Sequence, residues 1–250
     1  MSWISLERSR FIELLYPLLT VVVAARSKSG ISAMPAAWNT PLSMDPPLVG
    51  IVISPERFTY KLIVESKEYT INIFPYEYVD KVSLIGDVSA RYMKDKLTKL
   101  GFTVDNARSI GAPLLKEAIA VVECKLKDLV EVGDHDLLVG EVIDAYVKRE
   151  FITETLNFER YKPILYLGRV GKPKEVKRVY TTIKPEVHKT QPASSIVKEY
   201  VEKRKFVNAD VRRFLERTKT PTKDDIVKLA RKHGLEVDDI LYIMKSFRRT

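Results

Sequence analysis

The sequence predicts a mainly β domain with added helices, followed by a helical C-terminal extension. Short runs rich in valine and isoleucine recur between residues 20 and 170, separated by glycine, proline and polar turn residues. After residue 194, longer segments with helix-capping signals follow. We therefore expect a domain over residues 1–170, a proline-containing linker or arm over 171–193, and a helical extension over 194–250.

Charge separates the same two parts. The chain has 250 residues and a net charge of +9, with 42 basic and 33 acidic side chains. Residues 1–169 hold 21 basic and 22 acidic side chains, which leaves 21 and 11 for residues 170–250. The basic character therefore belongs to the C-terminal part, where any electrostatic partner is expected.

The elements of the first domain follow from local patterns. Residues 1–16 form a short helix or strand that ends at Tyr16-Pro17, because the residue before proline avoids the helical region. A glycine turn is expected at Gly133-Asp134. Residues 32–40 are expected to run extended, and helices are expected at 58–66 and 77–85. Strands are expected at 20–26, 48–54, 68–74, 119–126, 136–146 and 164–170.

The extension carries four helix signals, over residues 194–204, 208–217, 222–233 and 237–247. Asn208 and Thr222 occupy N-cap positions, and Gly234 occupies a C-cap position. The last two segments have the apolar spacing of an antiparallel helix hairpin.

Composition excludes several classes of protein. The one cysteine, Cys124, forms no intramolecular disulfide and is expected to be buried and inert, and no metal site is predicted. The longest apolar run near the N-terminus is too short for a membrane span, so we expect a cytoplasmic protein. Abundant Lys and Glu with a single glutamine point weakly to a thermophilic source.

The stretch from residue 27 to residue 72 carries the candidate ligand site. Small residues at 30–37 allow a flat ligand to approach the backbone, and Trp38 with Asn39 and Thr40 offers a stacking surface and hydrogen-bonding groups. The connection at 54–61 places hydroxyl groups among cations, which suits a phosphate. These residues are Ser54, Arg57, Thr59 and Lys61. The alternative is that Ser54 and Thr59 only cap the helix that follows.

The ordered segments YPLLTVVVAAR, ISAMPAAWNTPLSMDPPLVGIVIS, RFTYKLI, EYTINIF and VGDHDLLVGEV closely resemble the flavin reductase-like proteins, over about residues 11–169. This resemblance implies an FMN-binding split β-barrel. It also implies a homodimer with the flavin at the subunit interface.

The resemblance also implies roles for individual residues. Ser32, Ala33, Met34, Trp38, Asn39 and Thr40 would lie along the flavin ring and ribityl chain, and Ser54, Arg57, Thr59 and Lys61 near the phosphate. Asn72 joins the cofactor-binding set, and Lys96 would be a cation close to the ring. His135 stands where the reductases carry a histidine near the nicotinamide. The alternatives are a solvated helix face for Lys96 and a surface or capping role for His135.

Three functions follow from these expectations. The first is an FMN-dependent oxidoreductase that passes electrons from a nicotinamide or another donor to flavin or a partner protein. NADH or NADPH would dock transiently, because the chain has no GxGxxG element after a strand. The second is a flavoredoxin-like FMN electron carrier without nicotinamide activity. The third, which we consider the least favoured, is a nucleic-acid-binding protein that uses the basic tail.

Overall fold

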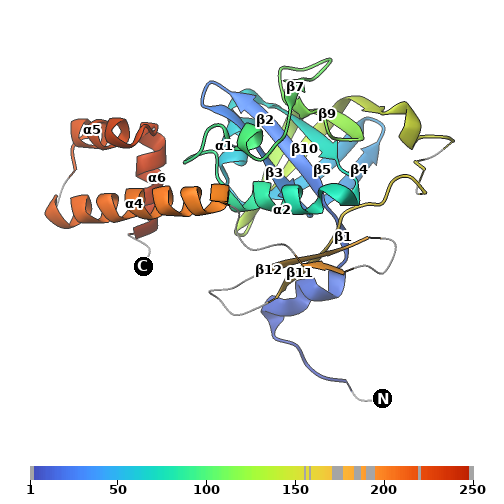
Figure 1. The fold of residues 1–250 in the computed structure, drawn as a ribbon, viewed down its shortest axis with the longest axis horizontal. Coiled ribbons are helices and arrows are strands. Elements are labelled where there is room, and N and C mark those ends of the chain that lie inside the picture. The colour runs from blue at the N-terminus through green and yellow to red at the C-terminus, as the bar shows by residue number, and fades with distance from the viewer. Residues whose placement is uncertain are drawn as a thin grey trace.

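A seven-stranded antiparallel sheet forms the body of the protein in this computed structural model, which describes residues 3–154, 156–157, 159–170, 177–182, 187–189, 195–218 and 221–247. The strand order is β3-β2-β6-β9-β10-β5-β4. Figure 1 labels all of these strands except β6. The bounds are β2 (Val21–Ser27), β3 (Gly30–Ala36), β4 (Asn39–Met44), β5 (Pro47–Ile53), β6 (Glu68–Ile73), β9 (Ala120–Val132) and β10 (His135–Val147). The predicted mainly β fold class is confirmed.

A second sheet corrects one expectation about the domain's end. Residues 164–170 were expected to form the last strand of the main barrel, but β11 (Leu165–Val170) pairs with β1 (Leu18–Leu19) and β12 (Lys177–Thr181). A short β13 (Val187–Lys189) follows β12, so the expected arm contains two strands. The reason is apolar burial, since Val179 and Tyr180 of β12 are both buried. A separate two-stranded sheet consists of β7 (Val104–Asn106) and β8 (Pro113–Leu115).

Strand β2 is buried on both faces of the main sheet. Its side chains alternate, so Val21 and Val23 enter one apolar cluster while Val22 and Ala24 enter the other. A strand covered on both sides needs apolar residues at every position, which explains the unbroken run in the sequence.

One helix covers each of these two faces. Helix α1 (Phe58–Ser66), whose bounds match the prediction, contributes Leu62 and Ile63 to the first cluster. Helix α2 (Val79–Asp87) follows the short helix η2 (Tyr76–Tyr78) and contributes Val82 and Ile85 to the second cluster. Short helices α3 (Lys96–Lys99), η1 (Arg8–Leu15) and η3 (Arg149–Phe151) complete this part, and no residue of η1 is buried.

The hairpin of β9 and β10 crosses the sheet with 13 residues in each strand. Val132 pairs with His135, so the predicted turn at Gly133-Asp134 is confirmed, and Gly133 has φ = 67°, which favours glycine. The predicted burial of Cys124 in β9 is also confirmed, and this burial raises the pKa of its thiol to about 12.

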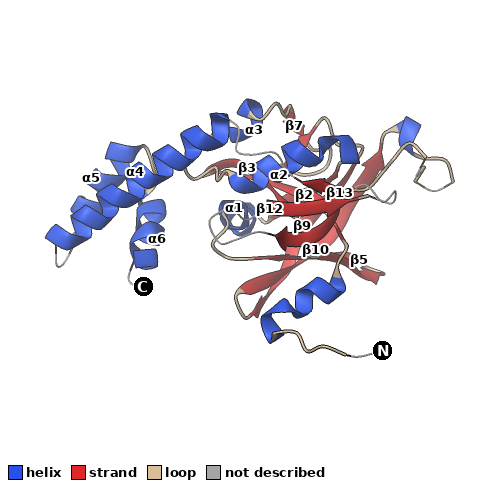
Figure 2. Cartoon of the chain, turned by 60° about the horizontal axis from the view of Figure 1, so that its bottom comes forward, coloured by secondary structure: helices blue, strands red, loops and turns tan. Residues whose placement is uncertain are grey.

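The C-terminal extension is a three-helix unit beside the main sheet (Figures 1 and 2). It comprises α4 (Ser195–Arg217), α5 (Lys223–His233) and α6 (Val237–Phe247). Asn208 was expected to begin a helix and instead lies inside α4, so that prediction is wrong. Thr222 caps α5 with Asp225 in a reciprocal capping box, and Gly234 ends it with φ = 62°, as predicted.

The extension has its own apolar core and packs on the segment between α2 and α3. Val88, Tyr92 and Met93 of that segment share one cluster with side chains from all three C-terminal helices. The apolar residues of this segment are buried by the extension. None of the helices in the described parts of the chain is long and apolar enough to span a bilayer.

Candidate functional site

The N-terminus of α1 forms the first part of the candidate site. Arg57 is its N-cap residue and no side chain caps the helix. The hydroxyl of Thr59 donates instead to the Ser32 Oγ of β3, at 3.0 Å, and both residues are buried. The Ser54 Oγ accepts only a 3.4 Å contact from the Glu56 amide. The capping alternative for Ser54 and Thr59 is therefore not realised, and the first amides of α1 stay available to an anion.

Strand β3 runs beside this helix end and supplies the next predicted residues. Ser32 and Ala33 are buried, and the partly buried Met34 packs on the cluster that contains Leu62. The hydrogen bond from Thr59 joins β3 directly to the first turn of α1. The structure thus brings together two predicted groups that lie 27 residues apart in the chain.

Trp38 and His135 meet at one end of the sheet. Their rings are 4.7 Å apart between centroids and inclined by 43°. The Val52 amide donates to the Trp38 carbonyl, and Asp136 pairs with Ile53, so both rings lie near the end of β5 that leads into Ser54. The ring nitrogen Nδ1 of His135 lies 2.9 Å from the Asp134 carboxylate, whose pKa is lowered by that contact.

Three other predicted residues have their polar groups in protein contacts. The side-chain amide of Asn39 donates to the carbonyls of Leu19 and Ala36, at 2.8 and 3.2 Å. The exposed Thr40 hydroxyl makes a 3.3 Å contact with the next residue's carbonyl. Asn72 is fully buried, donates to Val22 and Thr70, and accepts from the Leu115 amide. Both amide hydrogens of Asn72 are used within the protein and its side chain is fully buried, so the geometry gives Asn72 the role of joining strands.

Lys96, the first residue of α3, has a buried side chain. Its Nζ donates to the carbonyls of Ile85 and Val88, at 3.1 and 2.8 Å, so a solvated helix face is excluded. Burial, together with the nearby positive charge of Arg57, lowers the pKa of Lys96 to about 7. Lys61 of α1 is partly buried, and its Nζ lies 3.8 Å from the Glu65 carboxylate and 3.7 Å from that of Asp238 in α6.

Arg91 lies next to the candidate site, although no pattern in the sequence indicated it. Its side chain is buried and pairs with Asp239 of α6 at 2.8 Å. Its guanidinium also lies 4.1 Å from the centre of the Tyr242 ring. Asp239 lies 148 positions away in the chain and Tyr242 lies further still, so no local pattern around Arg91 could have indicated these two partners.

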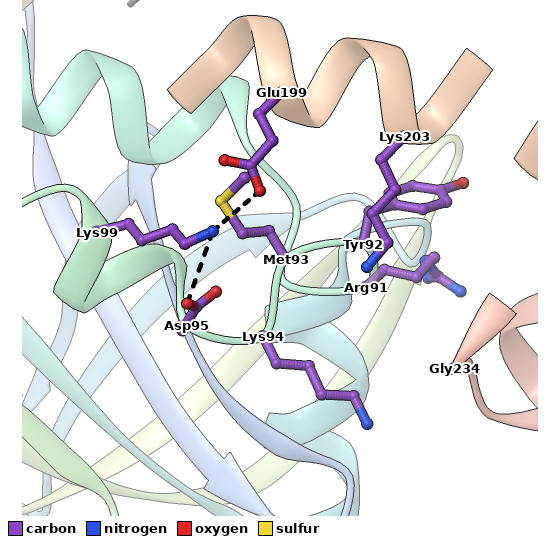
Figure 3. Close-up of a pocket in the computed structure, with 9 residues that line it drawn as sticks. All are labelled: Arg91, Tyr92, Met93, Lys94, Asp95, Lys99, Glu199, Lys203 and Gly234. Atoms are coloured by element: carbon purple, nitrogen blue, oxygen red, sulfur yellow. Dashed lines mark hydrogen bonds and ion pairs between the residues drawn. The ribbon is translucent and has the colours of Figure 1, made fainter. Parts of the chain in front are cut away.

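A cleft of about 260 Å³ lies where the extension meets the segment before α3. Figure 3 shows Lys99 between Asp95 and Glu199, with ion pairs of 3.8 and 3.0 Å. None of the predicted site residues lines this cleft. Its lining consists of Arg91, Tyr92, Met93, Lys94, Asp95, Lys99, Glu199, Lys203 and Gly234.

The chemistry available at the candidate site is binding and orientation. The amides at the start of α1, the exposed Arg57 and the Ser54 hydroxyl just before it suit a phosphate. The paired rings of Trp38 and His135 suit a flat aromatic group. Within the described residues, no group of three or more His, Cys, Asp or Glu side chains is placed to hold a metal ion.

Known proteins resemble this chain in sequence and in fold. An uncharacterised protein of Aeropyrum pernix is 35% identical over 245 residues, which covers 94% of this chain and 93% of the relative. The structure of an FMN-binding protein from Thermus thermophilus is 27% identical, with a TM-score of 0.58 over 78% of this chain and 98% of the other. A flavoredoxin from Methanosarcina acetivorans shares the fold at 21% identity, with a TM-score of 0.63 over 79% of this chain and 100% of that one.

The family model described as "Flavin reductase like domain" matches residues 15–169, which is more than half of the chain. Those residues include the whole seven-stranded sheet, α1 and the Trp38–His135 pair. The chain therefore belongs to the flavin reductase-like family.

Proposed function

We propose that this protein binds FMN and acts as a flavin-dependent oxidoreductase. The observation that carries the proposal is the α1 N-terminus, which has no side-chain cap and faces Ser32 through Thr59. Family membership and the likeness to the FMN-binding protein of Thermus thermophilus support it.

The residues present fit the proposed ligand. A phosphate would accept hydrogen bonds from the first amides of α1 and from the exposed Arg57, where the helix dipole favours negative charge. Ser32, Ala33 and Met34 would provide the surface along which the ligand extends. When bound, FMN supplies hydride and single-electron chemistry, so the protein has to bind and orient it. Asn72 has no direct part in this scheme.

One spectrum of the purified protein tests the proposal first. Bands of oxidised flavin are expected in the protein as purified, or in the colourless protein after FMN has been added and unbound FMN has been removed by gel filtration. Replacing Arg57 with alanine should weaken FMN binding and leave riboflavin binding nearly unchanged, because only FMN carries the phosphate. Lys28→Ala, which removes a cation elsewhere on the surface, is the control. A protein that binds neither flavin would refute the proposal.

The electron donor separates the enzyme from a flavoredoxin-like carrier. We propose that NADH, NADPH or another donor reduces the bound flavin, with His135 next to the docked nicotinamide, and that a second flavin or a partner protein accepts the electrons. Anaerobic mixing with each nicotinamide, followed at the flavin band, distinguishes the two. Bleaching supports the reductase, whereas no bleaching with either nucleotide would favour the carrier.

A homodimer is proposed from the exposed apolar side chains near the N-terminus. Helix η1 buries none of its residues, and the exposed side chains Trp3, Phe11, Leu14 and Leu15 are costly to leave in water on a monomer. A dimer of about twice 28.7 kDa is expected by light scattering. A monomer that still retained its flavin would contradict a shared site.

Nucleic-acid binding is the less favoured function. Helices α5 and α6 with the turn between them resemble a helix-turn-helix unit, but α6 begins with acidic residues. Asp238 and Asp239 contact Lys61 and Arg91 of the sheet domain, so this end of α6 is not free to enter a DNA groove. Salt-dependent retention on DNA would overturn this preference.

A further inference from the structure

The extension meets the candidate phosphate site through Arg91. The Arg91 Nη1 donates to the Asp239 carboxylate at 2.8 Å, and Nη2 contacts the Glu56 carbonyl at 3.5 Å. Glu56 directly precedes Arg57, the N-cap of α1. One guanidinium therefore spans from α6 to the connection that precedes the α1 N-terminus.

Two aromatic rings hold this guanidinium in place. Its Cζ lies 4.1 Å from the ring centre of Tyr242 in α6 and 5.8 Å from that of Phe58, the first residue of α1. The side chains of Arg91 and Asp239 are only 7% and 4% exposed, so water competes little for the contacts. A planar, forked cation between two rings has one preferred orientation, which a lysine ammonium does not reproduce.

Other ion pairs between the extension and the sheet domain have exposed side chains. Lys94 lies 4.0 Å from Glu236 with both side chains about 60% exposed, and Lys99 pairs with the exposed Glu199. Figure 3 shows Arg91 well separated from the Lys99–Glu199 pair. Lys61 of α1 also lies 3.7 Å from Asp238 of α6, but the Asp238 side chain is 75% exposed. Exposed pairs contribute little to a fixed geometry, so the buried Arg91–Asp239 pair is the one that gives this boundary a defined orientation beside α1.

We propose that the C-terminal extension is part of the cofactor site, with Asp239 and Tyr242 orienting Arg91 so that it holds residues 54–57 in the conformation that recognises the FMN phosphate. Arg91 is then a positioning residue, which acts on the phosphate through the Glu56 backbone. This inference rests on the proposed function, because it requires FMN to bind at α1.

The test compares FMN with riboflavin, which lacks the phosphate. The measured quantity is the ratio of the riboflavin Kd to the FMN Kd, from flavin fluorescence titrations of the full chain with its flavin removed. Arg91→Lys keeps the charge and removes the fork, and Tyr242→Leu removes the ring without changing charge. Each should lower the ratio at least fivefold while the riboflavin Kd stays within twofold. Lys99→Arg, the matched exchange at the exposed pair, should leave the ratio within twofold.

The possible outcomes separate the two proposals. A wild-type chain that binds no FMN refutes the proposed function before any variant is compared. If the wild type binds FMN and both variants keep its ratio, the role of the extension is overturned. An equal loss of FMN and riboflavin affinity also overturns it, because it would indicate general loosening. If Arg91→Lys does not fold, Tyr242→Leu alone decides by the same criterion.

Discussion

Replacing Lys96 with methionine should change how the stability of the flavin-free protein depends on pH. The pKa of Lys96 falls from 10.5 to about 7 on folding, because burial disfavours the charged ammonium. Between these values the unfolded chain holds a proton that the folded chain has released. The free energy of unfolding therefore rises with pH in this window, and Lys96→Met removes that contribution.

The magnitude follows from the size of the shift. One proton changes the stability by about 1.4 kcal/mol per pH unit, and integrating this linkage from pH 6 to pH 9 with the two pKa values gives about 2–3 kcal/mol. The methionine variant also loses the hydrogen bonds to Ile85 and Val88, but both the charged and the neutral amine donate them. Losing these hydrogen bonds lowers the free energy of unfolding by the same amount at every pH, so it does not change the dependence on pH.

Urea unfolding at pH 6, 7.5 and 9 measures the effect as the difference between wild type and variant. Titrations of other groups cancel in this difference. Lys94→Met is the control, because Lys94 lies two positions away with a side chain 64% exposed. A difference that stays constant from pH 6 to pH 9 would refute the reasoning, and so would one of opposite sign.

Three further substitutions test the packing around the site and in the extension. Gly140→Ala places a Cβ 2.0 Å from the Tyr69 hydroxyl and should cost about 1–3 kcal/mol of unfolding free energy in thermal melts, partly restored by adding Tyr69→Phe. Thr59→Val removes the donor to Ser32 and should lower the free energy of unfolding by about 0.5–1.5 kcal/mol, measured by urea unfolding. Thr98→Val, the same exchange at an exposed position, is the control. An unchanged free energy of unfolding in Thr59→Val would show that the bond is not formed. Thr222→Ala removes the capping box of α5 and should cost about 1 kcal/mol, and full retention of stability would contradict the cap.

Local signals in the sequence were sufficient for most elements. The bounds of α1 follow from its apolar spacing, and the unbroken apolar run of β2 follows from burial on both faces. Thr222 and Gly234 mark the ends of α5 because capping depends on residues within one turn. The residues around Trp38 and at the start of α1 could also be identified as a candidate ligand site. Small, aromatic and hydroxyl-bearing residues that occur together indicate such a site from the sequence alone.

Long-range contacts decided the rest. Asn208 carries a capping signal but lies inside α4, between Val207 and Val211, which are buried in the core of the extension. Apolar burial across a long amphipathic helix outweighs one residue's preference for a helix start. Strand β11 lies in a second sheet for a similar reason. Its pairing depends on β1 and β12, and no residue within β11 itself specifies these partners.

The sequence by itself determined the β domain, the helical nature of the extension and the stretch that carries the candidate site. Only the tertiary structure decided that Lys96 is buried and that Arg91 joins Asp239 to the start of α1. Periodicity and capping are properties of neighbouring residues, whereas the burial of a charge depends on which distant surfaces cover it. A lysine or arginine looks the same in sequence whether water or another helix surrounds it.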